Sequence, residues 1–270
     1  MLNLEPLHDW AKTCDGIPGI SVRQHLLSVS FAAEALLHGY PHLCERCDIT
    51  RNALLFLAAS HDVGKLSLDF LQKSPVWLER QNLTEKARQG AWKGIYTRPH
   101  PVISCDSMQK FLRDNRLLSG KSAACWSAVV GAHHGRIVRR YSSAPSVLKA
   151  SELVLEEKRQ ACLRELWERF DRPHLPEVPD RNAPVLWCMA GLVTLADWLG
   201  SDERFFPPDQ TLDEDELHRR AEATVEAVGL GLPPILPNLS FADIFGGRTP
   251  YTLQEETARM VDGPGIHVIE

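Results

Sequence analysis

An aspartate that directly follows a long apolar run is the feature that most restricts how this chain can fold. The segment is LAASHDVGKLSLDF, residues 57–70, in which His61 and Asp62 stand side by side and Lys65 follows. Burying a carboxylate without a partner costs several kcal/mol, which is on the order of the stability of a whole domain. A fold that buries this segment must therefore bring compensating groups to Asp62 from elsewhere in the chain.

Apolar residues recur at helical rather than alternating spacing along nearly the whole chain, which predicts an all-α fold. The expected helices cover residues 21–39, 51–66, 101–115, 123–135, 151–170, 185–200 and 213–231. Asp48 or Thr50 is expected to be the N-cap of the second of these helices. Residues 171–184 predict a proline-rich connector. The segment 185–200 is apolar nearly all round, so we expect it in the core.

The C-terminal stretch differs in composition from the rest. Residues 232–250 are rich in proline and glycine, which predicts a linker. Residues 251–270 predict a short helix, a turn and an incipient strand. A strand with no partner after it indicates the start of another domain. We therefore expect two parts, residues 1–232 and residues 233–270.

The bulk composition is that of an ordinary soluble globular protein, with 44% hydrophobic and 24% charged residues. A net charge of -5 excludes a global basic field, so nucleic acid would have to bind at a local patch or through a metal ion. The first residues have no basic region or apolar run typical of a secretory signal, and no segment suits a membrane span. A cytoplasmic protein without a membrane partner is expected.

The cysteine pattern argues against a disulfide framework, because the seven cysteines are odd in number and scattered. Cys44 and Cys47 form a lone C-x-x-C pair. A structural zinc site would need a second such pair. The pair is therefore more typical of two reduced thiols near a helix end.

The histidines indicate what could surround Asp62. Taken singly, each is more typical of a hydrogen-bonded core residue than of a ligand. Two aspartates in apolar settings and five histidines are explained together if they converge on metal ions. The candidate ligands are His25, His61, Asp62, His100, His133, His134 and Asp197.

Seven candidate ligands exceed the three or four of a mononuclear zinc site. They suit a pair of metal ions about 3.5–4 Å apart. At a helix end, His61 and Asp62 can flank one metal, or the carboxylate can bridge two. Imidazole-rich ligation favours two divalent transition-metal ions, with manganese, iron, cobalt or nickel expected before magnesium or zinc. Lys65 could hold a carboxylate, meet a substrate phosphate, or lie solvated at the surface.

The ordered set H…HD-x-G-K…H…HH…D resembles the HD-domain metal-dependent phosphohydrolases. A narrower resemblance is to the N-terminal HD nuclease domain of the CRISPR-associated nuclease–helicase of type I systems. The segments that carry it are LLFLAASHDVGKLSLDFLQKS, RPHPVIS, VVGAHHGRI and VTLADWLGSDERFF. The tail FADIFGGRTPYTLQEETARMVDGPGIHVIE resembles the entry to that family's helicase part. With no G-x-x-x-x-G-K-[ST] loop in the sequence, the chain is expected to stop just before the ATP-binding loop.

The resemblance implies an HD-domain helical bundle around a dinuclear metal site. It assigns one metal to His25, His61, Asp62 and Asp197, and a second metal to His100, His133 and His134 with Asp62 shared. Lys65 matches the family's lysine beside the HD pair, so Asp62 and Lys65 are the expected catalytic residues. His100 departs from the family pattern because it stands between two prolines, where H-E or H-G is more common.

The resemblance further implies cleavage of single-stranded DNA in CRISPR interference, with two metals activating water. The implied partners are single-stranded DNA, the Cascade surveillance complex and the helicase domains of the same chain, with ATP acting only through the helicase part. Arg136, Arg139 and Arg140 follow the HH pair and could bind backbone phosphates or form a solvated basic loop.

Three tryptophans are candidates for stacking on bases, namely Trp77, Trp92 and Trp198, although Trp198 is expected in the core beside Asp197. Two other functions stay open at this point. One is an HD phosphohydrolase that acts on nucleotides or cyclic nucleotides in a closed pocket. The other is a non-catalytic docking module whose metals are structural.

Overall fold

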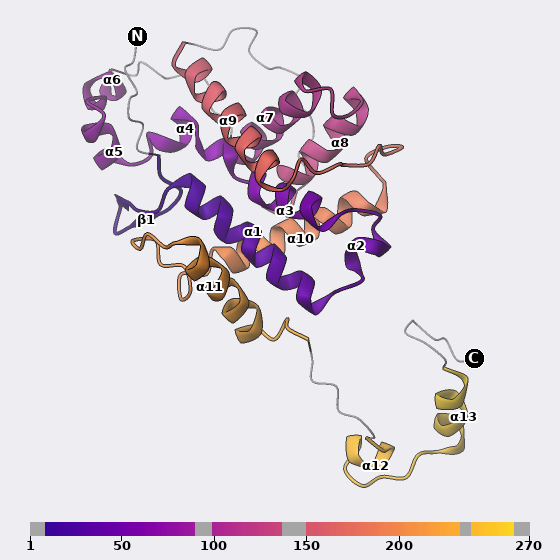
Figure 1. Ribbon diagram of the computed structural model, residues 1–270. Helices are drawn as coiled ribbons and strands as arrows, with labels where there is room; N and C mark the ends of the chain where they lie inside the picture. Colours follow the sequence, from indigo (N-terminus) through magenta and orange to yellow (C-terminus); the bar gives the residue numbers. More distant parts are fainter. Residues whose placement is uncertain (1–8, 90–98, 137–149, 233–238, 262–270) are drawn as a thin grey trace. The chain divides into compact units, whose positions relative to one another are not determined.

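The computed structural model describes residues 9–89, 99–136, 150–232 and 239–261. The chain divides into two compact units, Met1–Leu232 and Pro233–Glu270 (Figure 1). In the first unit the described strands are β1 (Thr13–Cys14) and β2 (Ile17–Pro18), which pair as an antiparallel hairpin. The rest of the regular structure described there is helical, which confirms the all-α prediction.

The helices of the first unit differ greatly in length. The long ones are α1 (Val22–Gly39), α3 (Arg51–Ser60), α7 (His100–Asp114), α8 (Gly120–Val130), α9 (Ala150–Arg169), α10 (Pro184–Gly200) and α11 (Glu214–Ala227). The short ones are α2 (Leu43–Arg46), the 3-10 helix η1 (Val63–Lys65), α4 (Leu68–Leu71), α5 (Pro75–Arg80) and α6 (Thr84–Arg88). The helical spacing of apolar residues predicted every long helix but not the hairpin or the short helices. Elements of two to six residues are too short to show a period.

The predicted helices that include the His61–Asp62 and His133–His134 pairs end earlier than expected. Thr50, rather than Asp48, is the N-cap of α3, since its side chain accepts a hydrogen bond from the backbone N–H of Ala53. The helix predicted over 51–66 stops at Ser60, and the helix predicted over 123–135 stops at Val130. The His61–Asp62 and His133–His134 pairs therefore lie in the turns just after α3 and α8.

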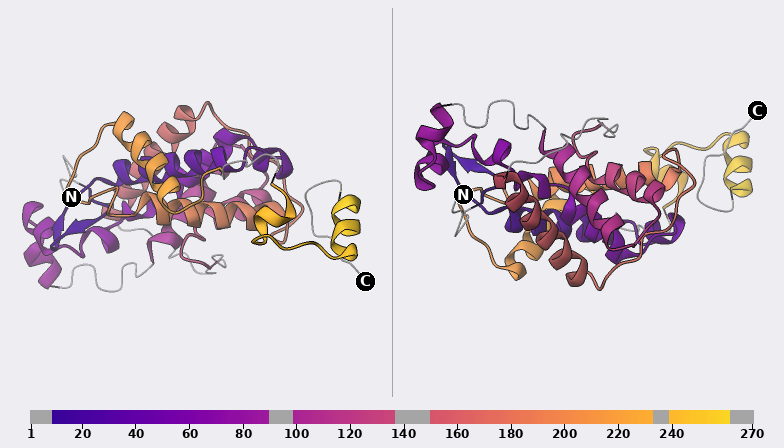
Figure 2. Two further views of the ribbon diagram at one scale, coloured as in Figure 1. Left: turned by 90° about the horizontal axis from the view of Figure 1, so that it is seen from below. Right: turned by 90° about the horizontal axis from the view of Figure 1, so that it is seen from above.

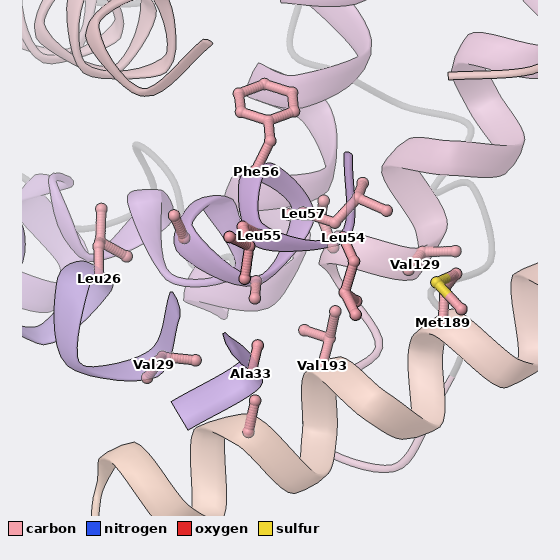
Figure 3. Packing of buried hydrophobic residues seen from close by; sticks show 14 of the residues in the cluster. Leu26, Val29, Ala33, Leu54, Leu55, Phe56, Leu57, Val129, Met189 and Val193 are labelled. Carbon is pink, nitrogen blue, oxygen red and sulfur yellow. The ribbon is translucent and has the colours of Figure 1, made fainter. Parts of the chain in front are cut away.

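The core of the first unit lies between α1, α3, α8 and α10. Figure 3 shows apolar side chains of these helices in one cluster, among them Leu26 of α1, Leu54 of α3, Val129 of α8 and Val193 of α10. The views from below and above show α1 and α10 still side by side (Figure 2). Full burial of one such leucine or valine contributes about 1.5–3 kcal/mol, so this cluster holds the loops at the helix ends in place.

The helix α10 crosses α1 at very short range. A Cβ added to Gly200 would lie 2.7 Å from the Cα of Val29, so the side-chain-free glycine allows the two backbones to approach. Asp197 lies one turn before Gly200 on α10, and His25 lies one turn before Val29 on α1. The close crossing therefore places these two residues near each other.

The tryptophans do not lie where the sequence suggested. The helix α10 contributes Leu186, Met189 and Val193 to the core, as expected, but Trp198 is 67% exposed and Trp187 is 56% exposed, so the prediction that Trp198 lies in the core is wrong. An all-apolar helix carries no polar residues that mark its outer face. Trp77 is 1% exposed in a second cluster with Trp10 and Phe70, which excludes it as a stacking platform. Trp92 lies outside the described residues.

The cysteines are all free, as expected for reduced thiols. Cys44 lies in α2 and Cys47 follows it, and the sulfur of Cys47 is 3.5 Å from that of Cys188 on α10. No group of potential metal ligands among the described residues includes a cysteine. Within the same residues, no helix has the length and hydropathy needed to cross a membrane.

The second unit contains α12 (Phe241–Ile244) and α13 (Thr252–Met260). Ser240 and Asp243 form a capping box that begins α12, so a short helix interrupts the predicted linker. The helix expected after Tyr251 is α13, whereas the expected strand falls on residues 262–270, outside the described part. The assignment of this unit to the start of a helicase domain stays a prediction.

Candidate metal centre

All the side chains singled out as candidate ligands lie together in the first unit. His25 comes from α1, His61 and Asp62 from the turn after α3, His100 from the first turn of α7, His133 and His134 from the turn after α8, and Asp197 from the last turn of α10. Their potential ligand atoms form two groups, in each of which all atoms lie within 4.8 Å of one another. We call His25, His61, Asp62 and Asp197 the buried group, and His100, His133 and His134 the open group.

Asp62 stands between the two groups and faces both. Its Oδ2 lies 3.0 Å from Nε2 of His25 and 3.3 Å from Nε2 of His61. Its Oδ1 lies 3.2 Å from Nε2 of His100 and 3.1 Å from Nε2 of His133. One carboxylate thus directs a different oxygen at each group of imidazoles, which is the arrangement of a bridging ligand.

The remaining members complete the two groups. Asp197 Oδ1 lies 3.3 Å from Nε2 of His61 and 3.8 Å from Nε2 of His25. In the open group, Nε2 of His134 lies 3.1 Å from Nε2 of His100. His25 and His61 are fully buried, whereas His134 is exposed, so solvent reaches the centre from the side of the open group.

Backbone carbonyl groups determine which imidazole nitrogens face the centre. Nδ1 of His61 lies 2.8 Å from the carbonyl oxygen of Ala58, and Nδ1 of His133 lies 3.1 Å from that of Val130. A carbonyl oxygen only accepts, so each Nδ1 carries a hydrogen and each Nε2 is the nitrogen that faces the centre. Histidines that ligate metals use the same outer contact to fix their tautomer.

Several buried atoms at the centre have no hydrogen-bond partner, among them Nε2 of His61, Nε2 of His133 and Oδ1 of Asp62. Imidazole nitrogens and carboxylate oxygens therefore converge at close range, and these three atoms are left without a hydrogen-bond partner. Leaving such groups unsatisfied costs about 1–3 kcal/mol each, and more when they are charged. Divalent cations would satisfy all of these atoms, so the donor set fits metal ions.

Burial and neighbouring charges of both signs shift the pKa values of the buried group. Burial lowers the pKa of His61, but the charges of Asp62 and Asp197 outweigh that effect and raise it to about 10. Burial lowers the pKa of His25 to about 3, and the ammonium of Lys65 adds to the lowering. Burial opposes ionisation of Asp62, yet Lys65 and His61 hold the pKa of this carboxyl well below its usual range. At His61 the two carboxylates thus favour a positive charge.

Lys65 is a buried partner of the Asp62 carboxylate. Its Nζ lies 2.6 Å from Oδ2 of Asp62, and the residue is only 8% exposed. This burial excludes a solvated surface lysine. The side chain also lies over the ring of Phe70, with Nζ 5.5 Å from the ring centroid, which keeps the stem in place.

The glycine between His61–Asp62 and Lys65 joins the two groups. The backbone N–H of Gly64 donates to Oγ of Ser104 on α7 (2.9 Å). A Cβ at Gly64 would lie 2.1 Å from the carbonyl oxygen of His100, so only glycine lets α7 come this close. The H-D-x-G-K spacing could have indicated this role, which sequence reasoning missed.

A buried arginine supports the same loop from the outside. Arg159 of α9 donates to the carbonyl oxygen of Leu66 (2.5 Å) and to Oγ of Ser107 (3.0 Å), and it pairs with Glu156 (2.8 Å). Nothing local in the sequence indicates this contact, because Arg159 lies in a helix rich in charged residues. Of the three arginines predicted to bind phosphates, Arg136 is exposed, while Arg139 and Arg140 lie outside the described residues.

Comparison with known proteins identifies the family. The family model described as Cas3, HD domain, matches residues 10–206. This chain belongs to the Cas3 HD-domain family. A curated relative, the CRISPR-associated nuclease/helicase Cas3 of Streptococcus thermophilus, is 26% identical over 185 residues. The match covers 62% of this chain and 20% of that protein, so the chain spans about a fifth of its relative's length.

Solved structures share the fold. A crystal structure of a CRISPR-associated protein matches with a TM-score of 0.67 and 26% identity, over 93% of this chain and 30% of that chain. The Thermus thermophilus cas3 HD domain, crystallised in the presence of Ni²⁺, matches with a TM-score of 0.56 and 23% identity, over 82% of this chain and 89% of that chain. A chain of a CRISPR RNA-guided surveillance complex before nicking matches with a TM-score of 0.58 and 21% identity, over 93% and 30% of the two chains.

Proposed function

We propose that this chain is a metal-dependent nuclease domain that hydrolyses phosphodiester bonds in single-stranded DNA with two divalent metal ions. The observation that carries the proposal is the placement of Asp62, whose two oxygens face two separate groups of imidazoles. A carboxylate shared in this way suits a dinuclear centre of the kind that acts on phosphate esters. Membership of the Cas3 HD-domain family supports the same class of reaction.

The residues would divide between two ions. The buried group would hold one ion, and the open group together with Asp62 would hold the other. When bound, the two ions would lower the pKa of a water molecule and neutralise charge that develops on the phosphate oxygens. The abundance of imidazole favours manganese, iron, cobalt or nickel.

The chain's own residues would direct the substrate. The ammonium of Lys65 lies beside Oδ2 of Asp62, where it would meet a substrate phosphate. His134 is exposed and His100 is partly exposed, so a phosphate reaches the centre from the open group. An approach from an exposed rim suits a polymer strand, and the exposed Arg136, which follows two residues after His134, is placed to bind a neighbouring phosphate.

We further infer that the domain acts beside a helicase and on DNA delivered by a surveillance complex. The curated relative is a nuclease/helicase, and one structural relative belongs to a surveillance complex. In this proposal the second unit begins the helicase part, and ATP is needed only there. Single-stranded DNA, Cascade and the helicase domains would be the partners.

The test is a cleavage assay on circular single-stranded DNA. The chain is stripped with a chelator and reloaded with Mn²⁺, Co²⁺ or Ni²⁺, and the Asp62→Asn variant is prepared identically as the control. We expect cutting that needs the added metal and that the variant lacks. Cyclic or free nucleotides replace DNA in a parallel series.

Three results would contradict the proposal. Hydrolysis of cyclic or free nucleotides without DNA cutting would assign a small-molecule phosphohydrolase. Bound metal with no hydrolysis of any substrate would indicate a docking module with structural metals. Equal cutting by the identically prepared Asp62→Asn variant would show that cleavage does not depend on the shared carboxylate.

A further inference from the structure

Two residues outside the set of candidate ligands meet at the C-terminal end of α10. Ser201 directly follows this helix, and its Oγ donates a hydrogen bond to Oδ1 of Asp197 (3.0 Å). Lys12 donates from Nζ to the carbonyl oxygen of Ser201 (2.8 Å). We propose that Ser201, supported by Lys12, is a positioning residue that fixes the carboxylate of Asp197 for metal binding. The inference rests on the metal centre of the proposed function.

Ser201 contacts the carboxylate oxygen of Asp197 that faces the imidazoles of the buried group. Oδ1 of Asp197 is the atom that faces Nε2 of His61 and Nε2 of His25. The side chain of Asp197 is 17% exposed, against 3% for that of Asp62, so its surroundings restrict it less. A hydroxyl donor one turn further along the chain limits the rotation of the carboxylate and keeps Oδ1 directed at the imidazoles.

Asp62 and Asp197 obtain their support in different ways. The ammonium of Lys65 lies beside Oδ2 of Asp62, at 2.6 Å. The partner of Asp197 is instead a neutral group, the hydroxyl of Ser201, which donates to Oδ1. The nearby Lys12 donates to the backbone carbonyl oxygen of Ser201 rather than to the carboxylate. A neutral donor leaves the charge of Asp197 available to a cation, whereas an ammonium at that oxygen would compete with the metal.

Lys12 connects the N-terminal hairpin to the metal centre. Its ammonium satisfies a carbonyl group at the C-terminus of α10, where positive charge is favourable. The hairpin itself is fixed, because the N–H of Gly19 donates to the carbonyl oxygen of Lys12 (2.9 Å) and the N–H of Ile20 donates to that of Pro208 (2.7 Å). Burial and the charge of Lys65 lower the pKa of Lys12, while Asp197 raises it, so Lys12 lies within electrostatic reach of the centre.

A purely structural role for these contacts makes a different prediction from a positioning role. As a helix cap alone, the contacts would affect stability and leave the metal affinity of the folded protein unchanged. As positioning contacts, they would affect the affinity of the buried group and leave the open group unchanged. Metal binding by the folded, metal-free chain separates the two roles.

The experiment titrates the chelated chain with Co²⁺ and follows visible absorption, which reports affinity and ligand geometry. For Ser201→Ala we expect about 10-fold to 100-fold weaker binding at one of two sites, since loss of an outer contact typically has this effect. Ser201→Thr keeps the hydroxyl and should restore the affinity. Lys12→Met should weaken the same site by a smaller factor.

Thr194→Val is the matched control. Thr194 lies on α10 and donates from Oγ1 to the carbonyl oxygen of Ala190 (2.8 Å), so the change removes a hydroxyl from the same helix without touching Asp197. We expect wild-type Co²⁺ binding in this variant. Unfolding temperatures of all variants in chelator show whether each one is folded before the titration.

Wild-type Co²⁺ affinity in folded Ser201→Ala would overturn the inference, as would equal losses in Ser201→Ala and Ser201→Thr. If Ser201→Ala does not fold, Lys12→Met decides: weaker binding at one site supports the inference, and unchanged binding overturns it. The titration contains no DNA. If the chain binds Co²⁺ as expected but cuts no DNA, the proposed function fails and this inference stands.

Discussion

The buried group and the open group combine similar side chains in different surroundings. His25, His61 and Asp62 are at most 2% exposed, whereas His134 of the open group is exposed. The buried group has two carboxylates, while the open group faces one of them and otherwise consists of imidazoles. Because the attraction of a dication grows with ligand charge and with exclusion of water, the buried group should bind metal more tightly. The open group should exchange its ion and meet the substrate.

The largest expected effect comes from removing the charge shared by both groups. In Asp62→Asn the side-chain volume is kept, but both sites lose their common carboxylate. We expect DNA cleavage to fall by about 10³-fold or more and both Co²⁺ sites to weaken. The reason is that the negative charge of Asp62 offsets the free-energy cost of desolvating the ion at each site. Loss of only one site in the Co²⁺ titration would show that Asp62 does not bridge.

Lys65→Met separates catalysis from metal binding. Its ammonium lies beside Oδ2 of Asp62 and repels a cation there. We expect cleavage to fall by about 10²-fold, the range that positioned proton donors and charges supply, with Co²⁺ affinity unchanged or higher. Cleavage rates at saturating metal, measured beside the titration, check this. Lower Co²⁺ affinity would mean that Lys65 acts only by holding the carboxylate.

Single histidine variants compare the two groups directly. His134→Ala should lower Co²⁺ affinity at the weaker site about 10-fold to 100-fold, and excess metal should restore much of the cleavage. His25→Ala should instead weaken the tighter site, and excess metal should restore little. If both variants affect the same site, the ligand atoms do not divide between two ions as the geometry indicates.

Gly64→Ala gives the smallest effect and tests how the groups are joined. The new Cβ would lie 2.1 Å from the carbonyl oxygen of His100, so α7 must shift. We expect the free energy of unfolding to fall by about 1–3 kcal/mol and binding at the open group to weaken, with the buried group unchanged. Gly120→Ala is the control, since nothing lies within 4 Å of a Cβ there. Urea unfolding and the Co²⁺ titration measure both effects.

The sequence by itself was sufficient for the helical class, for the long helices and for the seven residues that the structure brings together. Helical periodicity is a local property, and a charged pair after an apolar run requires partners wherever they lie in the chain. The order of the motifs also indicated the family that the comparison then confirmed.

Only the tertiary structure decided which groups support those residues. It placed the hydroxyl of Ser201 on Asp197, Lys12 on Ser201, and the backbone of Gly64 against His100. It also exposed Trp198, which an all-apolar helix had predicted to be buried. These outcomes depend on which faces of distant helices pack together. Hydrophobic periodicity does not identify the buried face of a helix that is apolar nearly all round. It also does not identify a contact partner that is far away in sequence.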